Sequence, residues 1–157
     1  MAALSEGGKA PTFTGKDQNG NTISLKDLKG KKVILYFYPT DDTPTCTTEA
    51  CNFRDNYHSL TSQGFEVIGV SADTEQSHQK FISKYDLPFT LIADTDNKII
   101  NKYNVWGEKQ MFGNKFWGIL RHTFVIDEKG VILKIIRKVK SKDAAGQILE
   151  ALEKLGK

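Results

Sequence analysis

Two cysteines, Cys46 and Cys51, are the residues whose type and spacing most clearly indicate chemistry in this chain. Thr43 and Pro44 precede Cys46, which is typical of a helix that begins with a threonine N-cap and a proline at its first position. A helix N-terminus carries unpaired N–H groups and the positive end of the helix dipole, and both favour a thiolate over a thiol. Because the second cysteine follows in the same segment, the pair indicates redox chemistry rather than a structural thiol.

Acidity alone does not make such a cysteine a fast nucleophile. A thiol with a pKa of ~8.5 is only ~3 per cent thiolate at pH 7, and lowering the pKa to ~6 gains roughly thirtyfold, or ~2 kcal/mol. Part of this gain is lost because the nucleophilicity of a thiolate falls with its pKa. Cys46 also begins an apolar helix stripe, so we expect a partly covered pocket in which a cation and hydrogen-bond donors stabilise the developing charge.

The segments around Cys46 predict an α/β fold. Continuous apolar runs, typical of strands buried on both faces, occupy residues 33–38, 65–71 and 89–93. One helical pattern follows Cys46 and has a single apolar face made of Ala50, Phe53, Tyr57 and Leu60. The other helical patterns cover residues 74–85, 98–103 and 144–155. Strands that alternate with helices indicate βαβ units, so we expect a central mixed, largely parallel sheet flanked by helices.

Two hairpins complete this expected sheet. Residues 124–127 and 131–137 predict an antiparallel hairpin at its end, and Asn19-Gly20 is a turn signal that predicts an N-terminal hairpin extension within residues 11–25. Cys46 then lies just beyond the carboxyl end of the first buried strand, which is where sites in such sheets occur.

An aromatic-rich loop is expected immediately before Arg121. Its large side chains are Trp106, Met111, Phe112, Phe116 and Trp117. Three roles are open for this loop, since it would serve equally well to line the pocket, to cover the core or to contact a partner.

The composition bounds the class of protein. The chain has 157 residues, which is typical of one domain, so we expect residues 1–157 to form a single domain. With 39% hydrophobic and 26% charged residues, a soluble globular protein is expected, and a net charge of +3 is too small to favour nucleic acid. We interpret the basic run at residues 134–142 as a solvated strand face. The apolar runs are far shorter than the ~20 residues of a membrane span.

We expect a cytoplasmic protein without a metal or bound cofactor. The first eight residues lack the charged and apolar regions of a signal peptide. Two cysteines make no disulfide scaffold, and an intracellular setting favours catalytic thiols. His58, His78 and His122 show no spacing typical of metal ligands, and we expect a non-catalytic role for each.

The segment that ends at Cys46 resembles a known family. Pro39, Thr43 and Cys46 match the Pro-x-x-x-Thr-x-x-Cys motif of peroxiredoxins, and the wider context is similar to the bacterioferritin-comigratory, or peroxiredoxin Q, branch. The matching motifs are Lys9-Ala10-Pro11-x-Phe13, Tyr36-Phe37-Tyr38-Pro39, Cys46-Thr47-x-Glu49-Ala50-Cys51, Phe53-Arg54-Asp55 and Arg121-x-Thr123-Phe124-Val125-Ile126-Asp127. The resemblance runs from Lys9 to the last helix, and it implies a thioredoxin-like fold.

This resemblance implies a thiol-dependent peroxidase that reduces hydrogen peroxide and organic hydroperoxides. Cys46 would be the peroxidatic cysteine, which attacks the peroxide and becomes a sulfenic acid, and Cys51 would resolve it to an intramolecular disulfide. Arg121 would favour the thiolate and donate hydrogen bonds to the peroxide, while the Thr43 hydroxyl would hold the peroxide oxygens. A thioredoxin-like dithiol donor would then reduce the disulfide.

Two further site residues follow from the resemblance. Pro39 would shield the sulfur from bulk water, and Glu49 would orient an arginine near the site. Each proposed role has a simpler alternative, because Pro39 also ends a strand, Thr43 also caps a helix and Glu49 also suits a helix N-terminus. Without the resemblance, Arg121 would be interpreted as a structural or surface arginine.

Helix geometry adds a mechanistic consequence. Positions five apart on an ideal helix are ~8.7 Å apart between Cα atoms and ~140° apart around the axis, whereas a disulfide needs Cα atoms within ~7 Å. Cys46 and Cys51 therefore cannot bond while the helix is intact, and we expect residues 45–53 to unwind in each cycle. A resolving cysteine in the same helix removes the need for a partner subunit, which favours a monomer.

Two positions depart from the pattern of the branch. Thr45 stands where glycine is common, and its bulk beside Cys46 would slow unwinding or narrow the access of peroxide. His122 stands where serine or threonine is frequent, and a titrating neighbour of Arg121 would alter the pH profile.

Three other functions use similar features. A thioredoxin-like disulfide oxidoreductase usually spaces its cysteines as Cys-x-x-Cys, whereas four residues separate Cys46 from Cys51. A copper-binding assembly module on the same fold would require Cys-x-x-x-Cys, a suitably placed histidine and usually a location outside the cytoplasm. A regulatory redox sensor would use the same residues as the peroxidase, and only its partners would distinguish it.

Overall fold

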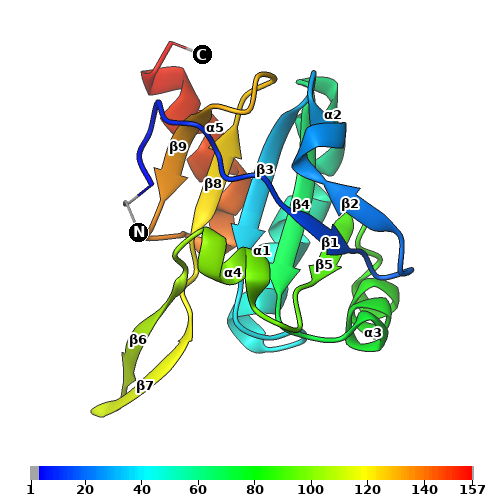
Figure 1. Ribbon diagram of the computed structural model, residues 1–157, viewed down its shortest axis with the longest axis vertical. Helices are drawn as coiled ribbons and strands as arrows, with labels where there is room; N and C mark the ends of the chain where they lie inside the picture. The colour runs from blue at the N-terminus through cyan, green and yellow to red at the C-terminus, as the bar shows by residue number, and fades with distance from the viewer. Residues whose placement is uncertain (1–3, 157) are drawn as a thin grey trace.

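A five-stranded mixed sheet forms the centre of the computed structural model (Figure 1). Its strand order is β5-β4-β3-β8-β9, and the strands are β3 (Lys32–Phe37), β4 (Phe65–Ser71), β5 (Thr90–Ala93), β8 (Thr123–Ile126) and β9 (Ile132–Ile136). Strands β3, β4 and β5 pair in parallel, whereas β3 with β8 and β8 with β9 pair antiparallel. The mixed sheet is confirmed, but parallel pairing covers half of it rather than most of it.

The structure describes residues 4–156. Residues 1–3, which belong to the segment expected to lack a signal peptide, and residue 157 of the expected single domain lie outside the described residues. Within the described range, no helix combines the length and the apolar character that crossing a bilayer requires.

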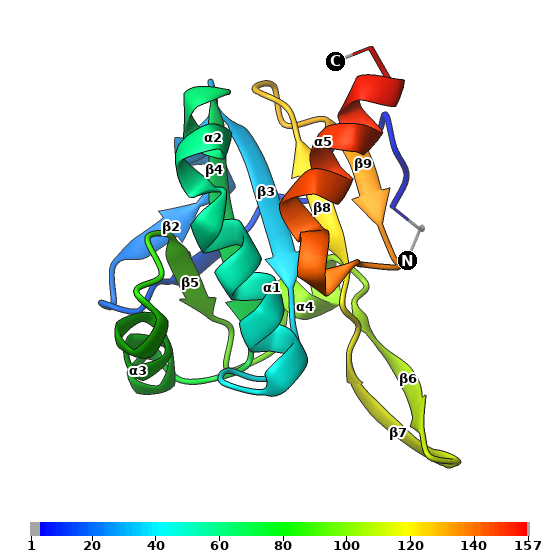
Figure 2. The same cartoon turned by 180° about the vertical axis from the view of Figure 1, so that it is seen from behind.

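Helices cover both faces of the sheet. Figure 2 shows α1 (Pro44–Asp55), α2 (Tyr57–Ser62) and α5 (Ala144–Lys154) across one face, with α5 preceded by the short helical turn η2 (Ser141–Asp143). Helix α3 (Glu75–Tyr85) lies beside β5 and adds Phe81 to the same core. The other face carries α4 (Lys98–Lys102), the helical turn η1 (Leu25–Leu28) and the N-terminal chain (Figure 1).

Strand β3 contributes to both cores because successive side chains of a strand point to opposite faces. Ile34 and Tyr36, with Tyr38 just after the strand, enter the core beneath α1 and α5, and the alternate residues enter the core beneath α4. This burial on both sides explains the continuous apolar run that predicts the strand. It also fixes β3 as a rigid base for the loop that leads to Cys46.

Helix α1 begins as expected and ends earlier than expected. Thr43 is the N-cap with an extended backbone, and Pro44 is the first helical residue. The apolar stripe that we expected on one helix is divided, because α1 ends at Asp55 and α2 starts after Asn56. The Asn56 side chain donates to the Asn52 carbonyl at 2.8 Å and thus competes with the backbone for a helical acceptor.

Both strands of the expected N-terminal hairpin are present. Strands β1 (Thr14–Lys16) and β2 (Thr22–Ser24) pair antiparallel, and Gly20 in the turn has a φ of 79° that favours glycine. This two-stranded sheet is separate from the central one, so it is an extension in the sense that we expected.

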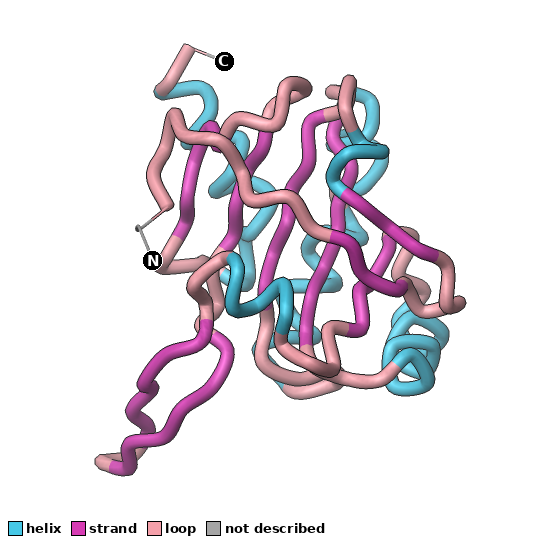
Figure 3. Tube along the Cα trace, in the orientation of Figure 1, coloured by secondary structure: helices cyan, strands magenta, loops and turns pink. Residues whose placement is uncertain are grey.

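The stretch before Arg121 is a β-hairpin and not the loop that the sequence suggested. Strands β6 (Trp106–Met111) and β7 (Asn114–Ile119) pair antiparallel and project from the body of the molecule (Figures 1 and 3). The two turn residues, Phe112 and Gly113, both have positive φ, which is the geometry of a type I′ turn. Residues 114–117 are all exposed, so the alternating burial that usually reveals a strand is missing.

Candidate active site

Cys46 lies in the first turn of α1, directly after the loop that leaves the carboxyl end of β3. Its side chain is only 1% exposed, so the thiol is buried rather than partly covered. Thr47 makes the first backbone hydrogen bond of the helix, from its N–H to the Thr43 carbonyl. The N–H of Cys46 therefore belongs to the first turn, whose donors have no acceptor within the helix.

Arg121 is brought to Cys46 by the sheet. The pairing of β3 with β8 places Tyr36 opposite Thr123, and the Phe37 N–H donates to the His122 carbonyl at 2.9 Å. The chain just before β8 is thereby held beside the strand that leads to the cysteine. The result is a hydrogen bond of 3.2 Å from Arg121 Nη2 to Cys46 Sγ.

Glu49 completes a charged cluster with these two residues. It lies one turn after Cys46 on α1, is fully buried, and accepts a 2.8 Å hydrogen bond from Arg121 Nη1 on its Oε1 atom. Burial raises the pKa of Glu49 to about 7, although Arg121 acts in the opposite direction. Its other oxygen, Oε2, has no hydrogen-bond partner among residues 4–156. One guanidinium thus serves two acidic side chains from the same helix.

The electrostatics of the cluster favour a permanently charged arginine. Burial lowers the pKa of Arg121, but the negative charges of Cys46 and Glu49 outweigh it and leave that pKa above its ordinary value. The Tyr36 hydroxyl is also buried here, and burial followed by the charges of Glu49 and Cys46 raises its pKa well above 10.0. Tyr36 is therefore a neutral neighbour of the site.

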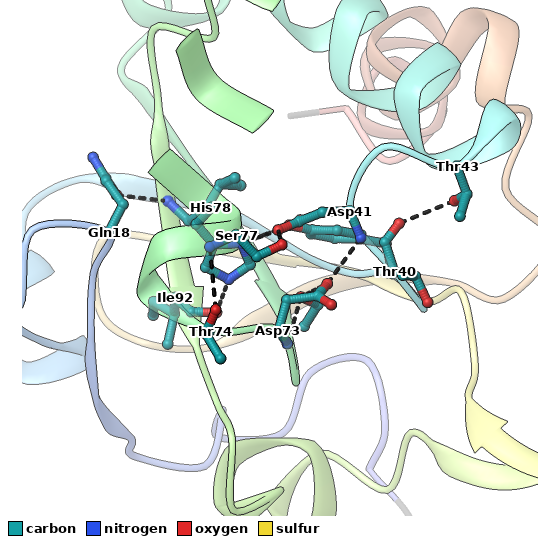
Figure 4. Close-up of polar contacts among 12 residues, drawn as sticks. Gln18, Thr40, Asp41, Thr43, Asp73, Thr74, Ser77, His78 and Ile92 are labelled. Carbon is teal, nitrogen blue, oxygen red and sulfur yellow. Dashed lines mark hydrogen bonds and ion pairs between the residues drawn. The ribbon is translucent and has the colours of Figure 1, made fainter. Parts of the chain in front are cut away.

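Thr43 and Pro39 lie on the loop between β3 and α1. The Thr43 hydroxyl donates to the Thr40 carbonyl at 3.0 Å (Figure 4), so it does not cap the helix with its side chain. Since a hydroxyl has one proton and two lone pairs, its oxygen stays able to accept a hydrogen bond from a ligand. Pro39 and Thr43 are both partly exposed and stand immediately before the buried Cys46.

Cys51 lies on the same helix but in different surroundings. It is partly buried beside a shallow pocket whose lining is Thr47, Thr48, Cys51, Asn52, Asp55 and Lys142. Both cysteines of the described chain are free thiols, and α1 is continuous through both of them. The structure therefore represents a reduced protein with its helix intact.

Lys109 is a cation near the cluster that no motif or spacing in the sequence singles out. It lies on β6, donates to the Ile119 carbonyl at 2.9 Å, and its Nζ stands 6.0 Å from the centre of the Phe116 ring. Burial and then the charge of Arg121 lower the pKa of Lys109, while Cys46 raises it. No spacing rule connects Lys109 to Cys46, because the hairpin decides their proximity.

The two departures from the branch pattern have different surroundings. Thr45 is exposed on α1, so its bulk extends into solvent. His122 is partly buried, and burial followed by the charge of Arg137 lowers its pKa below 6.5. His122 is therefore mostly neutral at pH 7.

The aromatic side chains of the β6–β7 hairpin are exposed, with 96% of Phe112 and 62% of Trp117 accessible.

A group of potential metal-ligand atoms lies apart from this cluster. Asp41, Asp73 and His78 bring such atoms within 4.8 Å of one another, which the spacing of the histidines in the sequence did not suggest. Hydrogen bonds already use both ring nitrogens of His78 and both carboxylate oxygens of Asp41. This group is thus internally satisfied and needs no metal to explain it.

Comparison with known sequences gives a consistent set of relatives. A family model described as the AhpC/TSA family matches residues 7–135. The chain is 50% identical over 153 residues to a protein named "Putative peroxiredoxin bcp" from Coxiella burnetii, an alignment that covers 98% of this chain and 99% of the relative. It is 46% identical over 147 residues to Peroxiredoxin Bcp from Bacillus subtilis, covering 94% of each.

Solved structures agree with the fold. A mutant of PrxQ from Xylella fastidiosa superposes with a TM-score of 0.90 at 27% identity and covers 100% of both chains. Peroxiredoxin Q from Xanthomonas campestris has a TM-score of 0.84 at 33% identity and covers 92% of both chains. The thioredoxin-like fold that we expected is confirmed by these similarities and by the strand order of the central sheet.

Proposed function

This chain belongs to the AhpC/TSA family and to its peroxiredoxin Q, or Bcp, branch of thiol-dependent peroxidases, and we propose that Cys46 is the residue that attacks the peroxide. The observation that carries this proposal is the hydrogen bond from Arg121 Nη2 to Cys46 Sγ at 3.2 Å. A guanidinium against a buried sulfur stabilises negative charge on it and leaves further N–H groups to donate to a peroxide.

The chemical step follows from this arrangement. The thiolate of Cys46 attacks one oxygen of the peroxide, so that an S–O bond forms while the O–O bond breaks. The sulfur is oxidised to a sulfenic acid, and the departing oxygen takes up a proton and leaves as water or an alcohol. Arg121 and the N–H groups of the first helical turn donate to the negative charge that develops on the oxygens.

Thr43 and Pro39 act on the substrate side of the sulfur in this proposal. The Thr43 hydroxyl gives its proton to the Thr40 carbonyl, so its oxygen accepts the O–H of the incoming peroxide. Pro39 adds apolar cover to the loop and limits the access of water. Glu49 holds the guanidinium through Nη1 and leaves Nη2 directed at the sulfur, which makes Glu49 a positioning residue.

Cys51 resolves the sulfenic acid. Its thiolate attacks the Cys46 sulfur, the new S–S bond replaces the S–O bond, and the departing hydroxide takes up a proton and leaves as water. Because α1 is continuous through both residues, their Cα atoms stand ~8.7 Å apart, which is beyond the ~7 Å that a disulfide allows. Residues 45–53 must therefore unwind before the disulfide forms.

A dithiol protein of the thioredoxin type returns the enzyme to its starting state. Thiol–disulfide exchange requires the donor thiolate to reach a sulfur, and unwinding exposes one. The protein acts on its own as a monomer, because one helix carries both cysteines. A compartment that keeps thiols reduced, such as the cytoplasm, suits this cycle.

Rapid mixing tests the assignment. Reduced protein is mixed with limiting hydrogen peroxide, and thioredoxin with its reductase is then supplied. Wild type turns over repeatedly, Cys46→Ser does not react, and Cys51→Ser reacts once and accumulates sulfenic acid. The two serine variants are matched controls for each other, since they differ only in which thiol remains on α1. Equal peroxide consumption by Cys46→Ser and wild type would overturn the proposal.

A further inference from the structure

The loop that carries Pro39 and Thr43 is fastened to the body of the molecule through Asp41 (Figure 4). The Asp41 side chain accepts from the Tyr38 hydroxyl at 2.6 Å on Oδ1 and from the Ser77 hydroxyl at 2.8 Å on Oδ2. His78 Nδ1 lies 2.7 Å from the same Oδ2 atom. These contacts join the loop to helix α3, because Ser77 and His78 lie on that helix, 36 and 37 residues after Asp41.

The hydrogen bonds determine where the protons of His78 lie. Its Nε2 stands 3.0 Å from the Ile92 carbonyl, which can only accept, so Nε2 carries a proton. Its Nδ1 faces a carboxylate oxygen, and two lone pairs at that distance would repel each other. A proton therefore lies between His78 Nδ1 and Asp41 Oδ2. The ring is fully buried, so this contact is made away from water and cannot be replaced by a solvent molecule.

The backbone of the loop is held at the same place. The Asp41 N–H donates to Asp73 Oδ2 at 2.8 Å, and the Ser71 hydroxyl donates to the same oxygen at 2.7 Å. Ser71 is the last residue of β4, which is paired with β3. The side chain and the main chain of Asp41 are thus both tied to rigid elements, whereas the next residues lead directly into the helix that must unwind.

From these contacts we propose that His78, acting through Asp41, is a positioning residue that keeps the loop before Cys46 in its reactive geometry. This inference rests on the proposed role of Cys46. In this proposal His78 and Asp41 do not contact the peroxide. It holds the turn in which the Thr43 hydroxyl meets the Thr40 carbonyl, so that the Thr43 oxygen faces the substrate each time α1 refolds.

The Asp41 anchor also defines where unwinding stops. Asp42 has a φ of 57° and its carboxylate is bound by Lys84 at 2.8 Å and Tyr85 at 2.9 Å, so a second and exposed contact ties the loop to α3. Exposed ion pairs contribute little, whereas a buried, fully hydrogen-bonded carboxylate is costly to disturb. His78 and Asp41 therefore form the fixed end of the segment, and the change of conformation starts beyond Thr43.

Two substitutions separate the contacts of the ring. In His78→Asn the amide nitrogen stands near the position of Nδ1 and keeps a donor for Asp41, while the contact to Ile92 is lost. In His78→Gln the amide nitrogen reaches the position of Nε2 and keeps the contact to Ile92, while the donor for Asp41 is lost. His78→Asn and His78→Gln thus each keep one of the two ring contacts, only His78→Asn keeps the contact to the loop, and both lose the imidazole.

The readout compares two reactions of the same sulfur. One is the second-order rate of oxidation by hydrogen peroxide, and the other is the rate of alkylation by iodoacetamide, which needs a thiolate but not the groups that hold a peroxide. We expect His78→Gln to lose about 10- to 100-fold in the peroxide rate, because a small misplacement of positioning groups costs that much. Alkylation stays within about threefold, and His78→Asn keeps both rates within about threefold.

Controls distinguish this inference from the proposed function. Ser77→Ala removes one donor from Asp41 at a partly exposed site, so it supplies a folded variant, and Ser83→Ala on the exposed side of α3 is its matched control. We expect Ser77→Ala to lower the ratio of the peroxide rate to the alkylation rate, and Ser83→Ala to leave that ratio unchanged. Wild-type ratios in both His78→Gln and Ser77→Ala, or equal losses in His78→Asn and His78→Gln, overturn the inference. Activity in Cys46→Ser instead overturns the proposed function.

Discussion

Arg121 Nη2 lies 3.2 Å from Cys46 Sγ, although 75 residues separate the two along the chain. The same guanidinium donates through Nη1 to Glu49, which is one helical turn from the cysteine. A single cation therefore connects the start of α1 with the chain just before β8. The geometry requires one planar cation that donates to two separate acceptors, and this requirement leads to the first prediction.

Arg121→Lys is expected to lose about 10-fold, and Arg121→Ala about 100- to 1000-fold, in the rate of Cys46 oxidation. Lysine keeps the charge but has no rigid fork, so it cannot hold Glu49 and the sulfur at once. Stopped-flow mixing of reduced protein with hydrogen peroxide measures the rate. Arg54→Lys is the control, because Arg54 lies on α1 with Cys46 but binds Asp55 and the Tyr85 carbonyl instead of the sulfur. Equal rates for wild type and Arg121→Ala would exclude Arg121 as the activating cation.

Glu49→Gln is expected to change how stability depends on pH. The pKa of Glu49 is raised by burial from 4.5 to about 7, so between these values the folded state keeps a proton that the unfolded state has lost. The free energy of unfolding contributed by Glu49 is therefore highest below pH 4.5 and declines as the pH rises to 7. Glutamine has no such proton to lose.

Urea unfolding of both proteins at a series of pH values measures this effect. Relative to wild type, Glu49→Gln gains about 1–3 kcal/mol between pH 4.5 and pH 7, and the difference is constant above pH 8. A difference that does not vary with pH would show that Glu49 has an ordinary pKa in the folded protein.

Tyr36→Phe and Tyr38→Phe form a matched pair with opposite outcomes. The Tyr36 hydroxyl is buried without a hydrogen-bond partner among residues 4–156, so its removal is neutral or stabilises by about 1 kcal/mol. The Tyr38 hydroxyl donates to Asp41 at 2.6 Å, so its removal costs about 1.5–3 kcal/mol. Thermal or urea unfolding gives both values. A large loss in Tyr36→Phe would indicate a buried water or a contact with Glu49 that becomes available in solution.

Hydrogen exchange is expected to locate the unwinding. In the disulfide form, amides of residues 45–53 lose protection because Cys46 and Cys51 cannot bond across an intact α1. Amides of α3 stay protected and supply the internal control, since Asp41 and Asp42 remain attached to that helix. Identical exchange around residues 45–53 in the two forms would contradict the mechanism.

Local signals in the sequence were sufficient for much of the fold. The three buried strands and the final hairpin agree with the structure to within a residue or two at their ends, and α1 starts at Pro44 as expected. Each is specified by features within the segment, namely burial on both faces of a strand or a proline after an N-cap residue. The resemblance to the peroxiredoxin Q branch depends on the same local motifs, and the comparisons confirm it.

Two elements escaped these signals for identifiable reasons. Residues 114–117 of the β6–β7 hairpin are all exposed, and its turn uses Phe112 at a φ of 52°, so neither periodicity nor turn composition revealed it. The break after α1 depends on Asn56, whose side chain takes the Asn52 carbonyl in competition with the backbone. The formation of the hairpin and the break between α1 and α2 both depend on small differences in free energy, which the residue pattern of a single segment does not reveal.

The distance between Cys46 and Cys51 is a property of the chain alone, because helix geometry sets it once Pro44 starts α1. The need for unwinding follows from that local fact. The surroundings of Cys46, in contrast, come from tertiary structure. Arg121 and Asp41 acquire their partners through the pairing of β3 with β8 and the packing of α3, which join residues far apart in sequence. Such contacts depend on how whole elements pack, and no spacing rule within one segment encodes them.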